Sequence, residues 1–420
     1  RPRISNVAFE WNTAELTGGA IYNFGSNGAS SPILTGVSFE RNVATVYRGG
    51  AMYNDGRNSG SSSPLLSLVI FNNNSAGRSG GAIYSDSDDG GSTSPVLFNV
   101  TFANNVAQEG GGAMYNDAGR SGTSSPFLNE VHFLQNSVQQ GPGGAMYIDS
   151  SDGITHTEIS GSMFVRNAAD GPGGAIYSYG SKGSTELTLT GITFDRNNSG
   201  SSGGAVSSSS QDGETRLLVE DTTFSSNSGN LGGALSAVRY GSGSCLVDLR
   251  NSTTFGNLAR SNGGGVYAHA CTLDITNATF TGNNAGMLDG IDVWSSLGNG
   301  TIRNTIMWGG GGADGSELYL SDPPYPFDIE YSIIDGGCPT NAQCNSIHIQ
   351  DPELGALQAN GGPTLTVLPS PNSVAIDNGL CTLPRDQRDI SRPQGNGCDI
   401  GSVESVAGLD IIFRNGFEGD

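Results

Sequence analysis

The chain repeats a short glycine-rich motif at a fixed interval, and this repeat constrains its fold more than any other feature. Gly18-Gly19-Ala20-Ile21-Tyr22 returns almost unchanged at 49–53, 80–84, 111–115, 143–147 and 173–177, with weaker copies at 203–207, 232–236 and 264–267. An aromatic residue, two variable residues and an asparagine precede most copies. The phenylalanines of this second motif recur every 30 to 32 residues, at 9, 39, 71, 102, 133, 164, 194, 224 and 255. A constant period near thirty predicts a repeat protein of stacked units.

The residues before each phenylalanine alternate between apolar and polar, which is the pattern of a half-buried strand. Val100 and Phe102 share one face, with Thr101 on the other. Helical periodicity is absent, and each glycine would cost a helix about 1 kcal/mol. Coils of short strands stack as a parallel β-helix, in which each coil pairs with the next over a thin core. The sequence therefore predicts an all-β solenoid of a single chain, with about 10 to 12 coils.

Two further positions of the repeat have a structural interpretation. The asparagines of the second motif should lie in register, where their amides can bond along a ladder: Asn42, Asn74, Asn105, Asn136, Asn167, Asn197 and Asn227. The glycines before each alanine can adopt positive φ and turn the chain between sheets without a Cβ clash. Both features stabilise a solenoid without implying catalysis.

Strand periodicity also predicts two columns of side chains on the outside of one face. If residues 21, 52, 83, 114, 146 and 176 point inward, the following tyrosines point outward, and an aspartate column follows two residues later. Rings can cover the apolar face of a sugar while acids accept its hydroxyl protons. The candidate ligand-binding residues are Tyr53, Tyr84, Tyr115, Tyr147, Asp55, Asp86, Asp117 and Asp149. The alternative is that the tyrosines only stack on one another beneath the loops.

The aspartate column raises the question of a metal ion. Carboxylates one strand spacing apart repel each other by roughly 1 kcal/mol in water, and calcium would relieve this repulsion. The candidate ligands are Asp86, Asp88, Asp89 and Asp117, with Asp152 nearby. Neither an EF-hand pattern nor a calcium-binding nonapeptide repeat is present. The alternative is a column of solvated acids whose side chains splay apart, with no cofactor.

Six cysteines lie late in the chain and are expected to form three disulfides. Cys245-Leu246-Val247-Asp248-Leu249 aligns with Cys271-Thr272-Leu273-Asp274-Ile275, which places the two sulfurs at one position of neighbouring coils, where stacked strands lie about 4.8 Å apart. Cys338 with Cys344, and Cys381 with Cys398, close short loops. No zinc-type spacing occurs. Three bridges imply an oxidising compartment outside the cytoplasm.

Charge and composition limit the classes of molecule that the chain is expected to bind. The formal net charge is −21, and Lys182 is the single lysine, so nucleic acid and anionic membranes are not expected as partners. Cations, basic partners and neutral glycans stay open. No apolar run is long enough for a transmembrane helix. The chain starts inside a repeat at Arg1, which we interpret as a processed or trimmed product.

The repeat divides the chain into four segments. Regular coils occupy 1–294, shorter irregular coils 295–350, a Pro- and Gly-rich cap over the open edge of the last coil 351–404, and a tail with an apolar cluster 405–420. We expect the tail to be a sorting or docking element.

The paired motifs resemble those of bacterial right-handed parallel β-helix proteins, in particular the polymorphic outer-membrane protein repeats. Residues 351–404 are similar to the C-terminal region of secreted bacterial β-helix proteins, with Asn360-Gly361-Gly362-Pro363-Thr364 and Cys398-Asp399-Ile400-Gly401. The final residues 412–418 resemble C-termini of exported Gram-negative proteins. The resemblance implies a right-handed parallel β-helix located outside the cell or on the outer surface of a Gram-negative bacterium. These families include adhesins, matrix proteins and carbohydrate-active enzymes.

The function expected from these features is a structural or adhesive scaffold that binds glycans or assembles end to end into fibres. The alternative is a polysaccharide lyase or glycoside hydrolase of the same fold. No catalytic residue is predicted, because the four histidines share no useful spacing and no nucleophile motif occurs.

Overall fold

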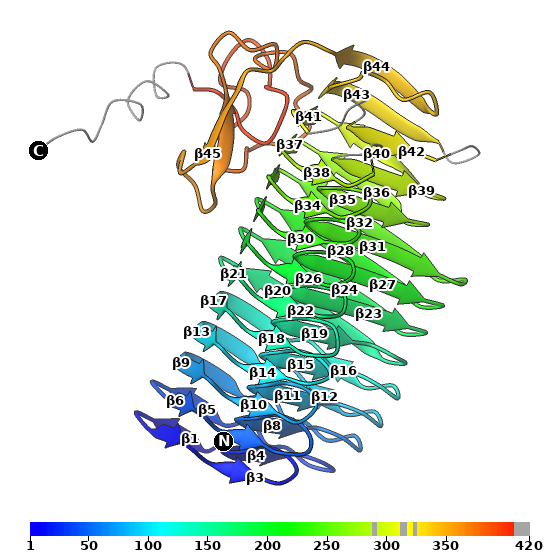
Figure 1. The fold of residues 1–420 in the computed structure, drawn as a ribbon. Helices are drawn as coiled ribbons and strands as arrows, with labels where there is room; N and C mark the ends of the chain where they lie inside the picture. The colour runs from blue at the N-terminus through cyan, green and yellow to red at the C-terminus, as the bar shows by residue number, and fades with distance from the viewer. Residues whose placement is uncertain (288–291, 311–316, 322–325, 407–420) are drawn as a thin grey trace, which may run out of the picture.

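The computed structural model is an elongated parallel β-solenoid (Figure 1). It describes residues 1–287, 292–310, 317–321 and 326–406, and within these ranges it contains no helix. The coils stack along one axis from the first strands to the C-terminal segment. About eleven coils are present, as the eleven parallel strands of one sheet indicate. The prediction of an all-β parallel solenoid is confirmed.

Three parallel sheets form the sides of the solenoid, and we number them by their order along a coil. Sheet 1 holds β1 (Arg3–Ser5), β2 (Ala8–Glu10), β5 (Ile33–Thr35), β6 (Ser38–Glu40), β9 (Leu65–Asn72), β12 (Ser92–Thr93), β13 (Val96–Ala103), β16 (Thr123–Ser124), β17 (Phe127–Leu134), β20 (Ile154–Ser160), β21 (Met163–Val165), β24 (Ser184–Thr190), β25 (Thr193–Asp195), β28 (Glu214–Glu220), β29 (Thr223–Ser225), β32 (Ser244–Arg250), β33 (Thr253–Phe255), β36 (Thr272–Thr276), β37 (Thr279–Thr281), β40 (Asn299–Arg303), β41 (Ile306–Trp308), β43 (Phe327–Ile334) and β44 (Ala342–His348).

Sheet 2 follows the asparagine turn and has strands of two residues: β3 (Thr13–Ala14), β7 (Val43–Ala44), β10 (Ser75–Ala76), β14 (Val106–Ala107), β18 (Ser137–Val138), β22 (Ala168–Ala169), β26 (Asn198–Ser199), β30 (Ser228–Gly229), β34 (Leu258–Ala259) and β38 (Asn284–Ala285). Sheet 3 begins after the glycine motif: β4 (Ile21–Phe24), β8 (Met52–Asp55), β11 (Ile83–Asp86), β15 (Met114–Asp117), β19 (Met146–Asp149), β23 (Ile176–Ser181), β27 (Val206–Gln211), β31 (Leu235–Tyr240), β35 (Val266–His269), β39 (Val293–Ser296) and β42 (Leu318–Leu320).

Stacked phenylalanines of sheet 1 fill the core. Phe39 and Phe71 have ring centroids 4.6 Å apart, and the stack continues in the same way from Phe9 to Phe224. Those from Phe39 onward are buried, and each buried phenylalanine contributes roughly 1.5–3 kcal/mol to stability.

The sequence motif misplaces one phenylalanine of the stack, Phe255. Phe224 pairs with Thr254, so Phe255 points to the other face, and the core position returns to phenylalanine at Phe280.

The predicted asparagine ladder is confirmed and is longer than expected. Asn74 illustrates it: its Nδ2 donates to Oδ1 of Asn105 at 2.9 Å and to the carbonyl of Phe39 at 3.0 Å. Its own Oδ1 accepts from the backbone N–H and the Nδ2 of Asn42. Equivalent bonds join Asn12, Asn42, Asn74, Asn105, Asn136, Asn167, Asn197, Asn227, Asn257 and Asn283. Each amide therefore satisfies two backbone groups of the preceding turn and joins the side-chain amide of the next one.

The glycine pair has two separate reasons to be glycine. Gly80 has a φ of +66°, the left-handed region in which a side chain is strained. A Cβ on Gly81 would lie 2.1 Å from the carbonyl oxygen of Gly112 in the next coil. The first glycine therefore turns the chain, as predicted, and the second allows close approach of successive coils.

The structure contains the three expected disulfides. Cys245 and Cys271 join neighbouring coils with their Cα atoms 4.6 Å apart. The other two bridges are Cys338–Cys344 and Cys381–Cys398. All six cysteines are paired, so no free thiol is present.

The Pro- and Gly-rich segment 351–404 packs against the side of the solenoid. It includes the antiparallel pair β45 (Leu354–Gln358) and β46 (Thr366–Pro369) and lies along the side of the last coils (Figure 1). Hydrogen bonds tie it to several successive coils through Thr364–Asp221, Asn251–Arg385, Thr253–Gln387, Thr382–Asn277 and Leu380–Asn304. The segment thus forms a lateral cap, held to turns of sheet 1 by side-chain and backbone hydrogen bonds, while a cap over the edge of the last coil stays a prediction.

Two further predictions concern the C-terminal tail and a membrane-spanning helix. The tail residues 410–420 lie outside the described residues, so the sorting element stays a prediction. Among the described residues, no helix has the length and apolar character needed to cross a membrane.

Candidate ligand-binding face

The tyrosines of the glycine motif form a column on sheet 3, one from each of the strands β4, β8, β11, β15, β19 and β23. Tyr84 stacks on Tyr53 at 5.5 Å and on Tyr115 at 4.8 Å between ring centroids. Tyr22 extends the column at one end, and Tyr147 and Tyr177 extend it at the other with tilted rings. Residues one period apart therefore lie directly over one another, as the sequence predicts.

The hydroxyls of the first four tyrosines each donate a hydrogen bond to the aspartate of the next coil. The distances to the aspartate Oδ2 atoms are 2.6 Å for Tyr22–Asp55, 2.5 Å for Tyr53–Asp86, 2.5 Å for Tyr84–Asp117 and 2.9 Å for Tyr115–Asp149. The two columns thus form one tyrosine–aspartate ladder. Their polar groups satisfy one another, which the sequence analysis did not foresee.

Much of this ladder is closed to solvent. Tyr53 is 3% exposed and Tyr84 0%, while Asp55 is 0% and Asp86 2% exposed. The expected column of solvated, splayed acids is therefore wrong at these positions, because the phenol of the preceding coil and nearby arginines cover the carboxylates. Tyr115, Tyr147 and Asp149 are half-buried. The structural alternative, tyrosines stacked under the loops, describes the middle of the column.

Two arginines that the sequence analysis missed complete the ladder. The guanidinium of Arg48 lies 4.5 Å from the ring centroid of Tyr84, with Nη1 3.9 Å from Asp86 and 4.0 Å from Asp117. Arg57 binds Asp55 through Nε and Nη2, both at 3.0 Å. The Asp-x-Arg spacing was a usable signal, since Arg250 binds Asp248 through the same fork and Arg388 binds one oxygen of Asp386 with the same two nitrogens. Arg48 sits in a segment between Ala44 and Gly49 that is one residue longer than its equivalent between Ala76 and Gly80.

Burial and neighbouring charges change the acidity of these groups. Burial raises the pKa of Tyr22 to about 12, and the hydrogen bond to Asp55 adds to the effect. Burial alone would raise the pKa of Asp55, but the hydrogen bonds from Arg57 and Tyr22 outweigh it and hold the pKa below its ordinary value. Burial raises the pKa of Asp86 and of Asp117. The ladder therefore retains phenol protons and weakens the ionisation of its inner carboxyls.

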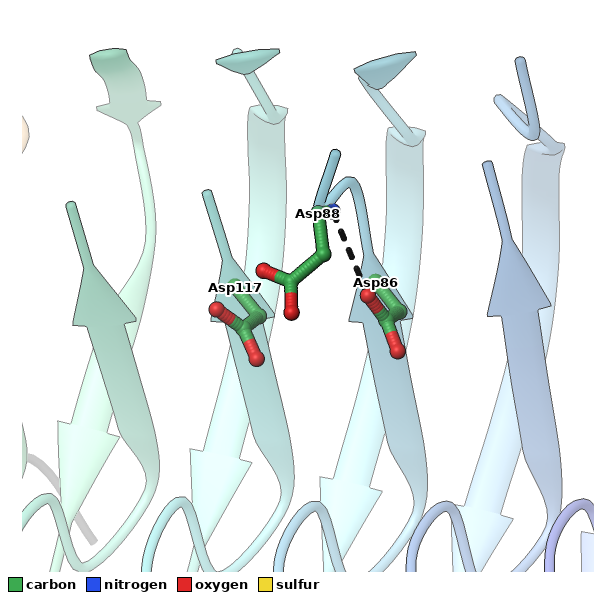
Figure 2. A group of neighbouring side chains, drawn as sticks. All are labelled: Asp86, Asp88 and Asp117. Carbon is green, nitrogen blue, oxygen red and sulfur yellow. Dashed lines mark hydrogen bonds between the residues drawn. The ribbon is translucent and has the colours of Figure 1, made fainter. Parts of the chain in front are cut away.

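Three of the predicted metal ligands come together, as Figure 2 shows. One ligand atom from each of Asp86, Asp88 and Asp117 lies within 4.8 Å of the others. The backbone N–H of Asp88 donates to Oδ1 of Asp86 at 3.3 Å, while Oδ1 of Asp88 is buried without a hydrogen-bond partner in the described structure. Burial, followed by the charges of Asp117 and Asp86, raises the pKa of Asp88 to about 7. This group could hold a metal ion.

Asp89, the fourth predicted ligand, is not part of this group. Its carboxylate pairs with Arg120, whose Nη1 lies 3.3 Å from Oδ1 of Asp89. The same guanidinium approaches Asp88 through Nη2 at 3.7 Å. Arg120 therefore supplies part of the positive charge that a cation would bring.

Comparison with known proteins supports the fold and the repeat. Residues 68–86 match the sequence family described as the Chlamydia polymorphic membrane protein (Chlamydia_PMP) repeat. The matched segment includes the core residue Phe71 and ends with Tyr84 and Asp86 of the ladder. The curated proteins and the solved structures gave no match to the chain. The chain is thus a parallel β-helix repeat protein with coils like those of the polymorphic membrane protein repeat.

Proposed function

We propose that the protein is a rigid scaffold outside the cell or on the outer surface of a Gram-negative bacterium, where it presents adhesive sites. The observation that carries this proposal is the use of polar side chains to join coils: the asparagine ladder and the tyrosine–aspartate ladder each run across successive coils. Side chains that are hydrogen-bonded to neighbouring coils fix the spacing of the coils and are not available for catalysis. The similarity of residues 68–86 to a membrane protein repeat and the three disulfides support an extracytoplasmic location.

Adhesion through glycans is the finer part of this proposal. Tyr115 and Tyr147 are half-buried on sheet 3, and Tyr22 is exposed at the other end of the column. Immobilised protein should bind a subset of glycans on an array, and beads coated with it should attach to host cells. Absence of binding to every glycan and to cells would contradict the adhesive role.

Calcium at Asp86, Asp88 and Asp117 fits the same structural role. Three oxygen donors are close together, and the unpartnered Oδ1 of Asp88 offers a ligand atom. Calcium should raise the unfolding temperature of the protein more than magnesium does, because the flexible carboxylates suit the larger ion. Asp88→Asn should remove this effect, whereas Asp89→Asn should leave it. Equal responses of both variants would argue against the site.

A polysaccharide-active enzyme is the second candidate function, and the carboxyl group of Asp88 favours it. A carboxyl with a pKa near 7 beside other carboxyls is the property of a general acid in glycoside hydrolysis. Incubation with neutral and anionic polysaccharides should release neither reducing nor unsaturated ends if the scaffold is correct. Release that disappears in Asp88→Asn would establish the enzyme instead.

Assembly end to end is a separate proposal. Within the described chain, β1, β2, β3 and β4 each pair on one side only. A parallel sheet edge can accept another strand through the same hydrogen bonds that join the coils. Negative-stain imaging over a range of concentrations should reveal rods longer than one molecule. Monomers at every concentration would exclude fibres.

A further inference from the structure

An open hollow lies beside the N-terminal end of the tyrosine column. It has a volume of about 450 Å³ and is lined by Leu16, Thr17, Tyr22, Tyr47, Arg48, Tyr53, Arg57 and Arg78. Three guanidinium groups and three phenol rings therefore face one space, and no carboxylate lines it. This composition is unexpected in a chain with a net charge of −21.

The arginines of the hollow retain donors for a ligand. Arg48 makes no side-chain hydrogen bond in the described structure, and its ion pairs with Asp86 and Asp117 are long, at 3.9 and 4.0 Å. Arg57 uses Nε and Nη2 for Asp55, which leaves Nη1. Nε of Arg78 lies 3.5 Å from Oε1 of Glu109, which is a long ion pair. The carboxylates behind the wall therefore orient the guanidinium groups without saturating them.

The rings of the hollow are accessible and fixed in position. Tyr22 is 43% exposed and Tyr47 40% exposed. Tyr22 stacks on Tyr53 at 5.1 Å, and the guanidinium of Arg78 lies 5.0 Å from the ring centroid of Tyr47. Such ordered rings offer flat apolar surface next to cationic donors.

Two other hollows of the molecule differ in charge. One contains Arg216 and Arg250 together with Glu220 and Asp248. The other contains Lys182 among several acids, including Asp152 and Asp212. In both, carboxylates that line the wall would repel an anion. Of these three hollows, the one at Tyr22 is suited to a negatively charged ligand.

We propose that the Tyr22–Tyr47–Arg78 hollow binds an acidic glycan, a sugar chain that carries carboxylate or sulfate groups. The guanidinium groups pair with the anionic substituents, and the tyrosine rings cover the apolar faces of the sugars. The inference rests on the proposed adhesive function and names its ligand class and its location. It differs from the middle of the tyrosine–aspartate ladder, where Tyr84 is closed to solvent.

The test uses the full chain and defined probes: heparin oligosaccharides, oligogalacturonates, neutral malto-oligosaccharides and a single-stranded DNA oligonucleotide. Calorimetry should detect binding of at least one acidic glycan that weakens with salt, and little binding of the neutral sugar. Arg78→Gln and Tyr47→Ala should each weaken acidic-glycan binding about tenfold. Equal binding of the neutral sugar, or equally tight binding of the DNA, would overturn the assignment.

Arg41→Gln is the matched control for Arg78→Gln. Arg41 lies 4.9 Å from the ring centroid of Trp11 and is 45% exposed, compared with 5.0 Å and 46% for Arg78. Each also pairs with a glutamate. Arg41→Gln should change the dissociation constant less than about twofold. If Arg78→Gln and Tyr47→Ala both bind acidic glycan as tightly as the parent protein, the hollow is excluded while the adhesive function stands. If the parent protein binds neither a glycan nor a cell, the proposed function itself fails.

Discussion

At the scale of single residues, the tyrosine–aspartate ladder joins buried acids to buried phenols. Tyr84 is fully buried and donates to Asp117, whose pKa is raised by burial. Tyr84→Phe removes that donor and should lower the free energy of unfolding by about 1–3 kcal/mol in urea titrations. Tyr47→Phe is the control, since Tyr47 is 40% exposed and its hydroxyl has no hydrogen-bond partner in the described structure. Equal loss in both variants would contradict a role for the buried bond.

A second buried acid predicts a pH dependence of stability. Asp292 is 0% exposed, and burial followed by the charge of Glu317 raises its pKa well above the ordinary value. Its stabilising contribution is therefore present below the pKa of the unfolded state, about 3.9, and is lost as pH rises through the higher folded pKa. Asp292→Asn should stabilise the protein at pH 7 and change little at pH 4, as measured by thermal unfolding.

Asp55→Asn is the opposite case on the same scale. The pKa of Asp55 is lowered, because the hydrogen bonds from Arg57 and Tyr22 outweigh the effect of burial. Its stabilising contribution is present above about pH 3.9 and is lost as pH falls through the folded pKa. Asp55→Asn should therefore destabilise at pH 7. If Asp55→Asn and Asp292→Asn change the stability at pH 7 in the same direction, the distinction between a carboxylate paired with an arginine and one without an arginine partner is contradicted.

At the scale of elements, the asparagine ladder holds the turn between sheets 1 and 2. Asn105 donates to Asn136 and to the carbonyl of Phe71, and it accepts from the backbone N–H of Asn74. Asn105→Ala removes the side-chain partner of the Phe71 carbonyl and of the Asn74 N–H, both in the preceding turn, and should cost about 2–4 kcal/mol. Asn72→Ala, at the end of β9, should cost less than about 0.5 kcal/mol because its contact with Asn104 is 3.4 Å long. Similar losses would show that the ladder does not stabilise the turn.

The phenylalanine stack contains one polar member, and it predicts a stabilising substitution. Thr254 occupies the core position between Phe224 and Phe280, and its buried Oγ1 has no partner in the described structure. Valine has nearly the same shape and lacks the hydroxyl. Thr254→Val should raise the free energy of unfolding by about 1 kcal/mol. A loss of stability would indicate that the hydroxyl binds water or a backbone group.

The sequence predicts the features that repeat and misses those that do not. Asn74 and Tyr84 lie in columns because their period is constant, and the two aligned cysteines at 245 and 271 follow from the same period. Phe255 misleads because it stands one residue after the core position, which Thr254 occupies in an unchanged register. Arg48 folds over Tyr84 from a segment with an extra residue, a contact that periodicity does not encode. The lateral position of 351–404 depends on polar contacts between distant segments.

At the scale of the whole molecule, stacked coils act as one rod. Each coil contacts its neighbours, so stability is close to a sum of coil and interface terms. The Cys245–Cys271 bridge and the lateral cap join several coils toward the C-terminal end. Such a rod holds the Asp86–Asp88–Asp117 group and the Tyr22–Tyr47–Arg78 hollow at a fixed distance from each other, which suits a surface scaffold.

Distances between spin labels along one column test this account most directly. Ser38, Ile70, Thr101, His132, Met163 and Thr193 are paired in register on the outer face of sheet 1, and no native thiol is free to react. Double electron–electron resonance between labels at Ser38→Cys and Met163→Cys should give about 19 Å, and between Ser38→Cys and Thr193→Cys about 24 Å. An increase of about one strand spacing for the added coil is the predicted result. Distances that do not increase from the first pair to the second would contradict the stacked coils and every role assigned to their columns.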